Sequence, residues 1–352
     1  MVGRSSVTEE FTAPELGGDA VVVPSVFHHP VRGVVHCPAA PLLTAWLQRH
    51  DTKTAVTALH HQLTPRDPDD GGQAVVATTF LDTTGQVFGL AVAADAERLP
   101  QARAAVATWS AVLRTRRMLL PAGAEPCAVP AAPASRLPHP RTTVVPPAPD
   151  CPHADAALQC LRRFAERGET VLLVGAGPLM PFAPCPRGNR VVAVPSIEAA
   201  RAVRVADPAA LSFVLRPCTL IEDAAAILAV LRARFPMLRG QHPDQWCYRA
   251  EDRRAAVNGA AACSDVALVL PGRDGQWSAP ARRTVRLTSL ADLYPGHLRN
   301  ASTVAVIGGD SDGLTPDTLT RVLTGLGPVS VVEHHVNSRV LPRTATRSAP
   351  PA

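Results

Sequence analysis

The sequence has few aromatic residues and almost no lysine. Aromatic residues make up 4% of the 352 residues, so Val, Leu and Ala have to fill the core that an apolar content of 46% predicts. Lys53 is the single lysine, and arginine supplies the other strongly basic side chains. We attribute this bias, with the abundance of Ala and Pro, to GC-rich coding and not to an anionic partner, although the formal net charge is +5. No basic run carries interleaved aromatic residues, so we expect no nucleic-acid surface.

Long hydrophobic runs are absent as well. No apolar segment reaches the length of a membrane-spanning helix, and residues 1–18 lack the apolar middle of a signal peptide. We therefore expect a cytoplasmic protein without a membrane partner. In a reducing compartment the eight cysteines would be thiols or metal ligands and not a disulfide framework.

What is present is an alternation of apolar strands and helices, which is typical of α/β proteins with parallel sheets. The expected strands are 20–26, 170–177, 189–196, 211–215, 265–272, 284–289 and 302–309, with a strand pair at 73–82 and 86–94. The expected helices are 41–49, 99–120, 153–168, 219–235, 251–264, 290–298 and 315–327. Thr219 with Glu222 predicts a capping box, and Thr315 predicts an N-cap.

Proline marks the main break in this alternation. Nine of the 30 residues from 121 to 150 are proline, which has no N–H and a fixed φ. This stretch is therefore predicted to be a linker or an extended loop and not a long helix or a central strand.

Three cysteines share a position just before a predicted helix: Cys37, Cys151 and Cys247. A helix N-terminus stabilises a thiolate, and sites in α/β proteins form at the C-terminal ends of strands. Three thiolates directed at one centre would fit an iron–sulfur cluster with one open iron, because thiolates are the usual cluster ligands. The alternative is that three of eight cysteines occupy such positions by chance.

The other five cysteines have simpler interpretations. Three of them lie in or beside apolar stretches and are predicted to be core residues: Cys160, Cys218 and Cys263. The remaining two, Cys127 and Cys185, lie in proline-rich loops.

The sequence segments around these cysteines resemble segments of a known protein family. "RARFPML", "HPDQWCYRAEDRRAAV" and "CSDVALVL" are similar to the third domain of the 4-hydroxy-3-methylbut-2-enyl diphosphate reductase (LytB/IspH) family. "DCPHADAALQCLRRFAERGETVLLVG", "LRPCTLIEDAAAILAVLRARFP" and "STVAVIGGDSDGLTPDTLTRVL" resemble other segments of that family in the same order. The likeness runs from about Pro149 to Gly327. It is weaker around "VVHCPAA", where the family's glycine pair beside the cysteine is missing.

This resemblance implies three α/β domains with small parallel sheets around a central [4Fe-4S] or [3Fe-4S] cluster held by Cys37, Cys151 and Cys247. It implies a reductase that removes an allylic hydroxyl from an isoprenoid diphosphate, with ferredoxin or flavodoxin as electron donor. The corresponding division of the chain is a disordered lead at 1–18, a divergent first domain at 19–120, a linker at 121–148, a second domain at 149–243, a third domain at 244–336 and a disordered tail at 337–352.

The positions at which the sequence differs from the family are those that donate protons and bind the diphosphate in the family. The family's His-x-Gly-His-x-Glu residues are replaced by side chains that cannot donate a proton: Ala176, Leu179 and Pro181. The diphosphate-binding residues are reduced to Ser278, with Thr315 in place of a serine.

Basic residues are the other candidates for contacting the diphosphate. Arg216, with Arg249 and Arg273, could supply charge, or each could be an ordinary surface arginine. We therefore keep two hypotheses: a divergent reductase acting on an altered substrate, or a non-catalytic, cluster-bearing paralogue acting as a redox sensor or scaffold in terpenoid metabolism.

Overall fold

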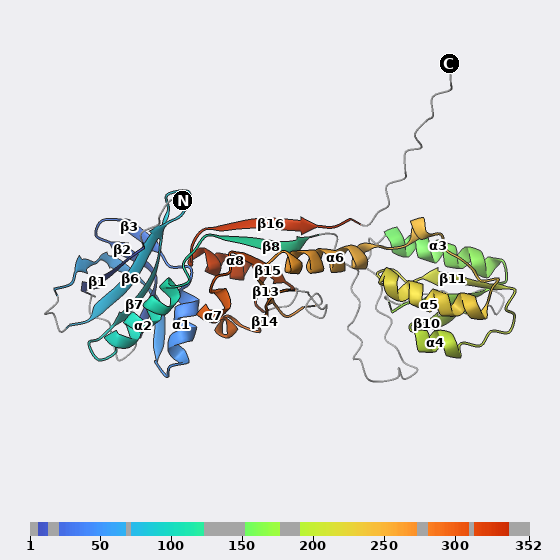
Figure 1. Cartoon of the computed structure of the whole chain (residues 1–352), viewed down its shortest axis with the longest axis horizontal. Helices are drawn as coiled ribbons and strands as arrows, with labels where there is room; N and C mark the ends of the chain where they lie inside the picture. Colours follow the sequence, from blue (N-terminus) through green and yellow to red (C-terminus); the bar gives the residue numbers. More distant parts are fainter. Residues whose placement is uncertain are drawn as a thin grey trace, which may run out of the picture. The chain divides into compact units, whose positions relative to one another are not determined.

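The computed structural model describes residues 6–12, 21–67, 72–122, 152–176, 191–272, 281–309 and 313–337 (Figure 1). The chain divides into two compact units. Unit 1 comprises Met1–Pro121 and Val257–His334, and unit 2 comprises Ala122–Ala256 and His335–Ala352. Helices and several small sheets alternate in both units, which confirms the α/β class. No helix in these described ranges is long and apolar enough to cross a membrane.

The first sheet of unit 1 has seven strands in the order β4-β2-β3-β7-β6-β1-β5. They are β1 (Val7–Thr12), β2 (Val21–His29), β3 (Gly33–His36), β4 (Thr54–Gln62), β5 (Thr64–Pro65), β6 (Ala74–Leu81) and β7 (Val87–Ala94). The expected strand pair is confirmed as the antiparallel β6–β7 hairpin. The expectation of a parallel sheet holds only in part here, because the sheet is mixed. β2 pairs in parallel with β4, and β3 pairs in parallel with β7. The β2–β3 and β6–β7 pairs are antiparallel, because a short turn can join only antiparallel neighbours.

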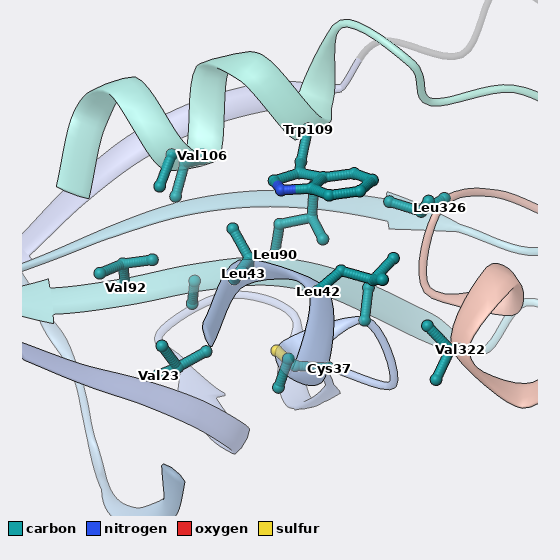
Figure 2. Close-up of a cluster of buried hydrophobic side chains, with 14 of the residues drawn as sticks. Val23, Cys37, Leu42, Leu43, Leu90, Val92, Val106, Trp109, Val322 and Leu326 are labelled. Atoms are coloured by element: carbon teal, nitrogen blue, oxygen red, sulfur yellow. The ribbon is translucent and has the colours of Figure 1, made fainter. Parts of the chain in front are cut away.

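Helices α1 (Ala40–Gln48) and α2 (Leu99–Ser110) bury their apolar faces against this sheet. Trp109 on α2 has no exposed surface, and Figure 2 shows it extending from the helix toward the sheet, with Leu326 beside its ring. The predicted helix at 99–120 is wrong beyond Ser110, because Arg116–Ala122 form strand β8. β8 pairs in parallel with residues 303–305, and a pairing between segments so far apart in sequence overrides the local helical period.

The second sheet of unit 1 has the order β14-β13-β15-β8-β16. Its other strands are β13 (Val266–Val269), β14 (Thr284–Arg286), β15 (Thr303–Ile307) and β16 (Val329–His335). Helix α6 (Arg249–Ala262) places Val257, Ala260 and Ala261 on this sheet. Helix α8 (Pro316–Thr324) begins at Thr315, so that predicted N-cap is confirmed. The predicted helix at 290–298 is broken into a 3-10 turn at Leu290–Asp292 and the single turn α7 (Pro295–Leu298).

Unit 2 contains the parallel sheet that the sequence predicts. Its strand order is β10-β9-β11-β12, with strands β9 (Thr170–Val174), β10 (Val191–Val194), β11 (Leu211–Leu215) and β12 (Arg239–Gly240). Helix α3 (Pro152–Glu166) packs on the face that carries Val171 and Leu173. Helices α4 (Ile197–Ala202) and α5 (Ile221–Arg234) cover the face that carries Leu172 and Val174. Both faces are buried, which is why the strands are continuously apolar.

The start of α5 differs from its predicted capping box. The helix begins at Ile221, and no side chain of its own N-cap residue bonds to its first turn. The N–H of Ile221 donates instead to Glu251 Oε2 at 3.2 Å, across from α6. The Thr219–Glu222 box is therefore wrong, because a carboxylate from another helix satisfies this end of α5.

Candidate functional site

Two cysteines of unit 2 meet at the C-terminal edge of its parallel sheet. Cys218 follows β11 and precedes α5, whereas Cys247 follows a 3-10 turn at Pro243–Gln245 and precedes α6. Their Sγ atoms are 3.8 Å apart, and their exposed fractions are 6% and 4%. Both are thiols in this structure.

The first turns of three helices surround this pair. Ala154 of α3, Leu220 before α5 and Ala250 of α6 form one apolar cluster with the two cysteines. The N-terminal ends of helices carry partial positive charge and N–H groups without intrahelical partners. The dithiol pair, Cys218 and Cys247, therefore lies where negatively charged sulfur is stabilised.

The backbone of Cys218 brings two groups to Cys247. Cys218 has φ of 59°, in the left-handed region that residues other than glycine rarely adopt. In this conformation both its thiol and its backbone N–H bond to the Cys247 sulfur. The next residue, Thr219, lies close to Gly175 at the end of β9. This approach requires glycine there, because a Cβ on residue 175 would lie 2.2 Å from Thr219 Oγ1.

These contacts lower the pKa of Cys247 well below that of an ordinary thiol. The hydrogen bond from the Cys218 side chain is the largest cause, and burial opposes it by raising the pKa. The N–H groups of Arg249 and Cys218 and the charge of His153 lower it further. Cys247 is thus poised as a thiolate at neutral pH, which is the form that ligates metals and reacts as a nucleophile.

Cys37 has a different environment in unit 1. It lies between β3 and α1, as predicted, and its N–H donates to the carbonyl of Ser25 at 2.8 Å. Its side chain is only 2% exposed and faces the apolar core near Val23 and Leu43 (Figure 2). Burial raises the pKa of this thiol, so the surroundings favour the protonated form.

The remaining predicted site residues are spread over the chain. Cys151 and Ser278 lie outside the described residues. Thr315 in unit 1 donates its hydroxyl to Thr318 Oγ1 at 3.0 Å and accepts from the Thr318 N–H at 3.1 Å. Arg216 in unit 2 is 7% exposed at the end of β11, so it is not an ordinary surface arginine. Burial lowers the pKa of Arg216.

One of the cysteine interpretations needs correction. Cys263 was expected in the core, but it is exposed because α6 ends before it. Cys218 is buried in an apolar cluster, as expected, and it also belongs to the candidate site. Cys218 shares the signal used for the other three cysteines, a place between a strand and a helix start, and that signal could have identified it. Cys160 is confirmed as a core residue of α3.

A three-ligand metal site is not found among the residues that the structure describes: no group of three or more His, Cys, Asp or Glu side chains there could hold a metal ion. The dithiol pair supplies two soft sulfur donors, which suit zinc, copper(I) and iron–sulfur chemistry. Ala154, which belongs to the same apolar cluster as the pair, stands three residues after Cys151 in the sequence.

Comparison with known proteins gives a consistent set of relatives. No protein-family model matches the chain. The 4-hydroxy-3-methylbut-2-enyl diphosphate reductase of Aromatoleum aromaticum is 28% identical over 192 residues, covering 51% of this chain and 62% of that enzyme. The Ruegeria pomeroyi enzyme of the same name is 31% identical over 133 residues, covering 37% and 41%. The protein named 4-hydroxy-3-methylbut-2-enyl diphosphate reductase 2 of Mycobacterium bovis is 30% identical over 206 residues, covering 52% of this chain and 58% of that protein.

These alignments have partial coverage on both sides. The chain spans about half the length of the curated relatives that it matches, from 41% to 62% in the three cases above. Among solved structures, the E-1-hydroxy-2-methyl-but-2-enyl-4-diphosphate reductase of Plasmodium falciparum matches with a TM-score of 0.36 and 18% identity, over 53% of this chain and 64% of that chain.

Proposed function

Because the chain is a divergent member of the 4-hydroxy-3-methylbut-2-enyl diphosphate reductase family, we propose that it is an iron–sulfur-dependent reductase of isoprenoid synthesis. The reaction would replace a hydroxyl group of a small isoprenoid diphosphate, or of a related compound, by hydrogen and release water. The relatives reported above are named as reductases, which favours this function over a redox sensor or scaffold. The observation that carries the proposal is the stabilised thiolate of Cys247 at the start of α6.

The proposed cluster ligands are Cys37, Cys151 and Cys247. When bound, the cluster would supply the electrons for the reduction. Cys247 fits this role because its surroundings favour the thiolate that iron requires. The support for Cys151 as a second ligand is its place three residues before Ala154, which shares an apolar cluster with the dithiol pair. The assignment of Cys37 rests on the resemblance alone, since its apolar surroundings favour the thiol.

Substrate contacts are proposed for Arg216, Ser278 and Thr315. Arg216 supports this assignment best, because it is a largely buried cation two residues before Cys218 at the end of a parallel strand, where ligands of α/β proteins bind. Its guanidinium could bind two phosphate oxygens at once. Ala176 stands at a family histidine position and offers neither charge nor a hydrogen-bond donor to a diphosphate oxygen, so we propose a substrate less charged than the family's usual one.

The electron donor in this proposal is a small redox protein such as ferredoxin or flavodoxin. The reduction consumes two electrons and two protons for each hydroxyl released as water. Such a donor has to meet this protein before it can pass electrons to the cluster. The rate of substrate reduction should therefore depend on the concentration of the donor. This dependence can be measured once a substrate has been found.

The decisive experiment is purification without oxygen, followed by iron and sulfide analysis and a visible spectrum. We expect the wild-type protein to contain iron and sulfide and to show a broad visible absorption band. Cys247→Ala and Cys37→Ala should lose the band, whereas Cys263→Ala, which removes an exposed cysteine, should keep it. Full iron content in Cys37→Ala would remove Cys37 from the ligand set.

The activity test uses 4-hydroxy-3-methylbut-2-enyl diphosphate with a chemical reductant. Consumption of the compound by the wild-type protein, lost in Cys247→Ala, would support the reductase. A protein that contains the cluster but does not consume this diphosphate or less charged analogues would favour the sensor or scaffold. A protein free of iron after reconstitution would refute the cluster.

A further inference from the structure

We propose that Cys218 and Cys247 form a reversible disulfide, which makes the dithiol pair a redox modification site of unit 2. The disulfide itself does not depend on the proposed reductase function. Its consequence for the cluster, given below, does rest on that function.

The geometry of the pair is close to that of a disulfide. The two Sγ atoms are 3.8 Å apart, and they would have to approach by about 1.8 Å to reach the S–S bond length of roughly 2.05 Å. The apolar cluster that contains the pair includes two alanines, Ala154 and Ala250, whose side chains are single methyl groups.

The backbone holds Cys218 in position for this bond. The left-handed conformation of Cys218 directs its side chain at Cys247, although a conformation of this kind costs about 1 kcal/mol or more. The turn is held by the bond from the Arg216 N–H to the Val174 carbonyl, at 2.9 Å. Gly175 allows the turn to lie against the end of β9. A pair held in this way loses little additional freedom when it is crosslinked.

Hydrogen peroxide is the class of oxidant that fits a pair with so little exposed surface. The sulfur of one cysteine, as thiolate, attacks one peroxide oxygen, the O–O bond breaks, and a sulfenic acid and water form after protonation. The sulfur of the other cysteine then attacks the sulfenic sulfur, the S–S bond forms, and a second water leaves. In total the two thiols lose two electrons and two protons, and one peroxide is reduced to two water molecules.

The disulfide would exclude the proposed cluster. A sulfur engaged in an S–S bond is no longer a thiolate, which is the form that ligates iron. Oxidation of the iron-free protein would therefore prevent cluster loading until a dithiol such as dithiothreitol restored Cys247.

The test uses the full-length, iron-free, reduced protein and a limited dose of hydrogen peroxide. Remaining thiols are then alkylated, and the products are identified by intact and peptide mass spectrometry. We expect a mass loss of about 2 Da before alkylation and one crosslinked peptide pair that joins Cys218 to Cys247. Dithiothreitol should reverse both changes. Cys218→Ser and Cys247→Ser should each abolish the crosslink, and Cys263→Ser should retain it.

The wild-type protein alone can overturn the proposal, so it does not depend on how the variants fold. A sulfinic acid at one cysteine with the other still open to alkylation would refute it, and so would a crosslink from either cysteine to Cys151. A Cys218–Cys247 crosslink in a protein that binds no iron in any preparation would support this inference and refute the cluster. Iron binding without the crosslink would refute this inference alone.

Discussion

The thiol of Cys218 is the largest cause of the lowered pKa of Cys247, and removing it provides a quantitative test of the site. In Cys218→Ala the N–H groups of Arg249 and residue 218 remain, and only the side-chain hydrogen bond is lost. A hydrogen bond to a charged group contributes about 1.5–3 kcal/mol. Since roughly 1.4 kcal/mol corresponds to one pKa unit, we expect the pKa of Cys247 to rise by about one to two units.

The assay is the rate of Cys247 alkylation by iodoacetamide as a function of pH, followed by peptide mass spectrometry on the iron-free protein. At a pH below both pKa values, the thiolate fraction falls tenfold per unit, so alkylation in Cys218→Ala should be about 10–100-fold slower than in wild type. Each rate is compared with its own plateau at high pH, which corrects for a change in access. Cys263, which is exposed, serves as the internal reference thiol.

A matched variant separates the hydrogen bond from the change in volume. Cys218→Ser keeps a donor at the same position, so the pKa of Cys247 should stay below the value in Cys218→Ala. If the alkylation midpoint in Cys218→Ala equals that of wild type, the Cys218 thiol does not stabilise the Cys247 thiolate and the reasoning is wrong. Equal midpoints in the Ser and Ala variants would refute the role of the donor.

Three further predictions concern stability, each measured by urea unfolding. Trp109→Ala removes a side chain with no exposed surface and should cost about 3–5 kcal/mol; a loss below about 1 kcal/mol would contradict its place in the core. Gly175→Ala should destabilise the protein by about 1–3 kcal/mol, because φ is 100° and the new Cβ meets a side chain at 2.2 Å. Gly296→Ala, which meets nothing within 4 Å, is its control and should be neutral or slightly stabilising. The Asp265 carboxylate accepts two backbone N–H bonds that lower its pKa, so its contribution is complete above the unfolded pKa of about 3.9 and is lost as the pH falls through the lower folded value. Asp265→Asn should flatten this acid dependence, and an unchanged slope would contradict the assignment.

Predictions that depend on local chemistry agree with the structure. The apolar run within 170–177 predicts a buried strand, and β9 lies between two parallel neighbours, β10 and β11. Thr315 followed by proline predicts a helix start, and α8 begins there. The pattern around Cys247 predicts a helix directly after it, and α6 follows. Each of these signals lies within a few residues of the feature that it predicts.

Predictions that depend on distant partners fail. Residues 116–120 continue a helical period, yet they lie in strand β8 because β15 supplies hydrogen bonds from about 185 residues further along the chain. Thr219 and Glu222 have the spacing of a capping box, yet a glutamate of α6 satisfies the first turn of α5. Differences in local propensity between conformations are smaller than the contribution of a sheet pairing or of a half-buried carboxylate at a helix start.

The candidate site shows the same division. Sequence by itself determined that Cys247 stands at a helix start, because the polar segment before it and the helical period after it are both within a few residues of it. Only the tertiary structure decided that its neighbour is Cys218, 29 residues earlier. That contact requires β11 and α6 to end and begin at the same edge of unit 2, and it requires a left-handed turn at residue 218. The free energy that holds this arrangement comes from burying the helices on both faces of the sheet, a property of the whole unit that no single segment carries.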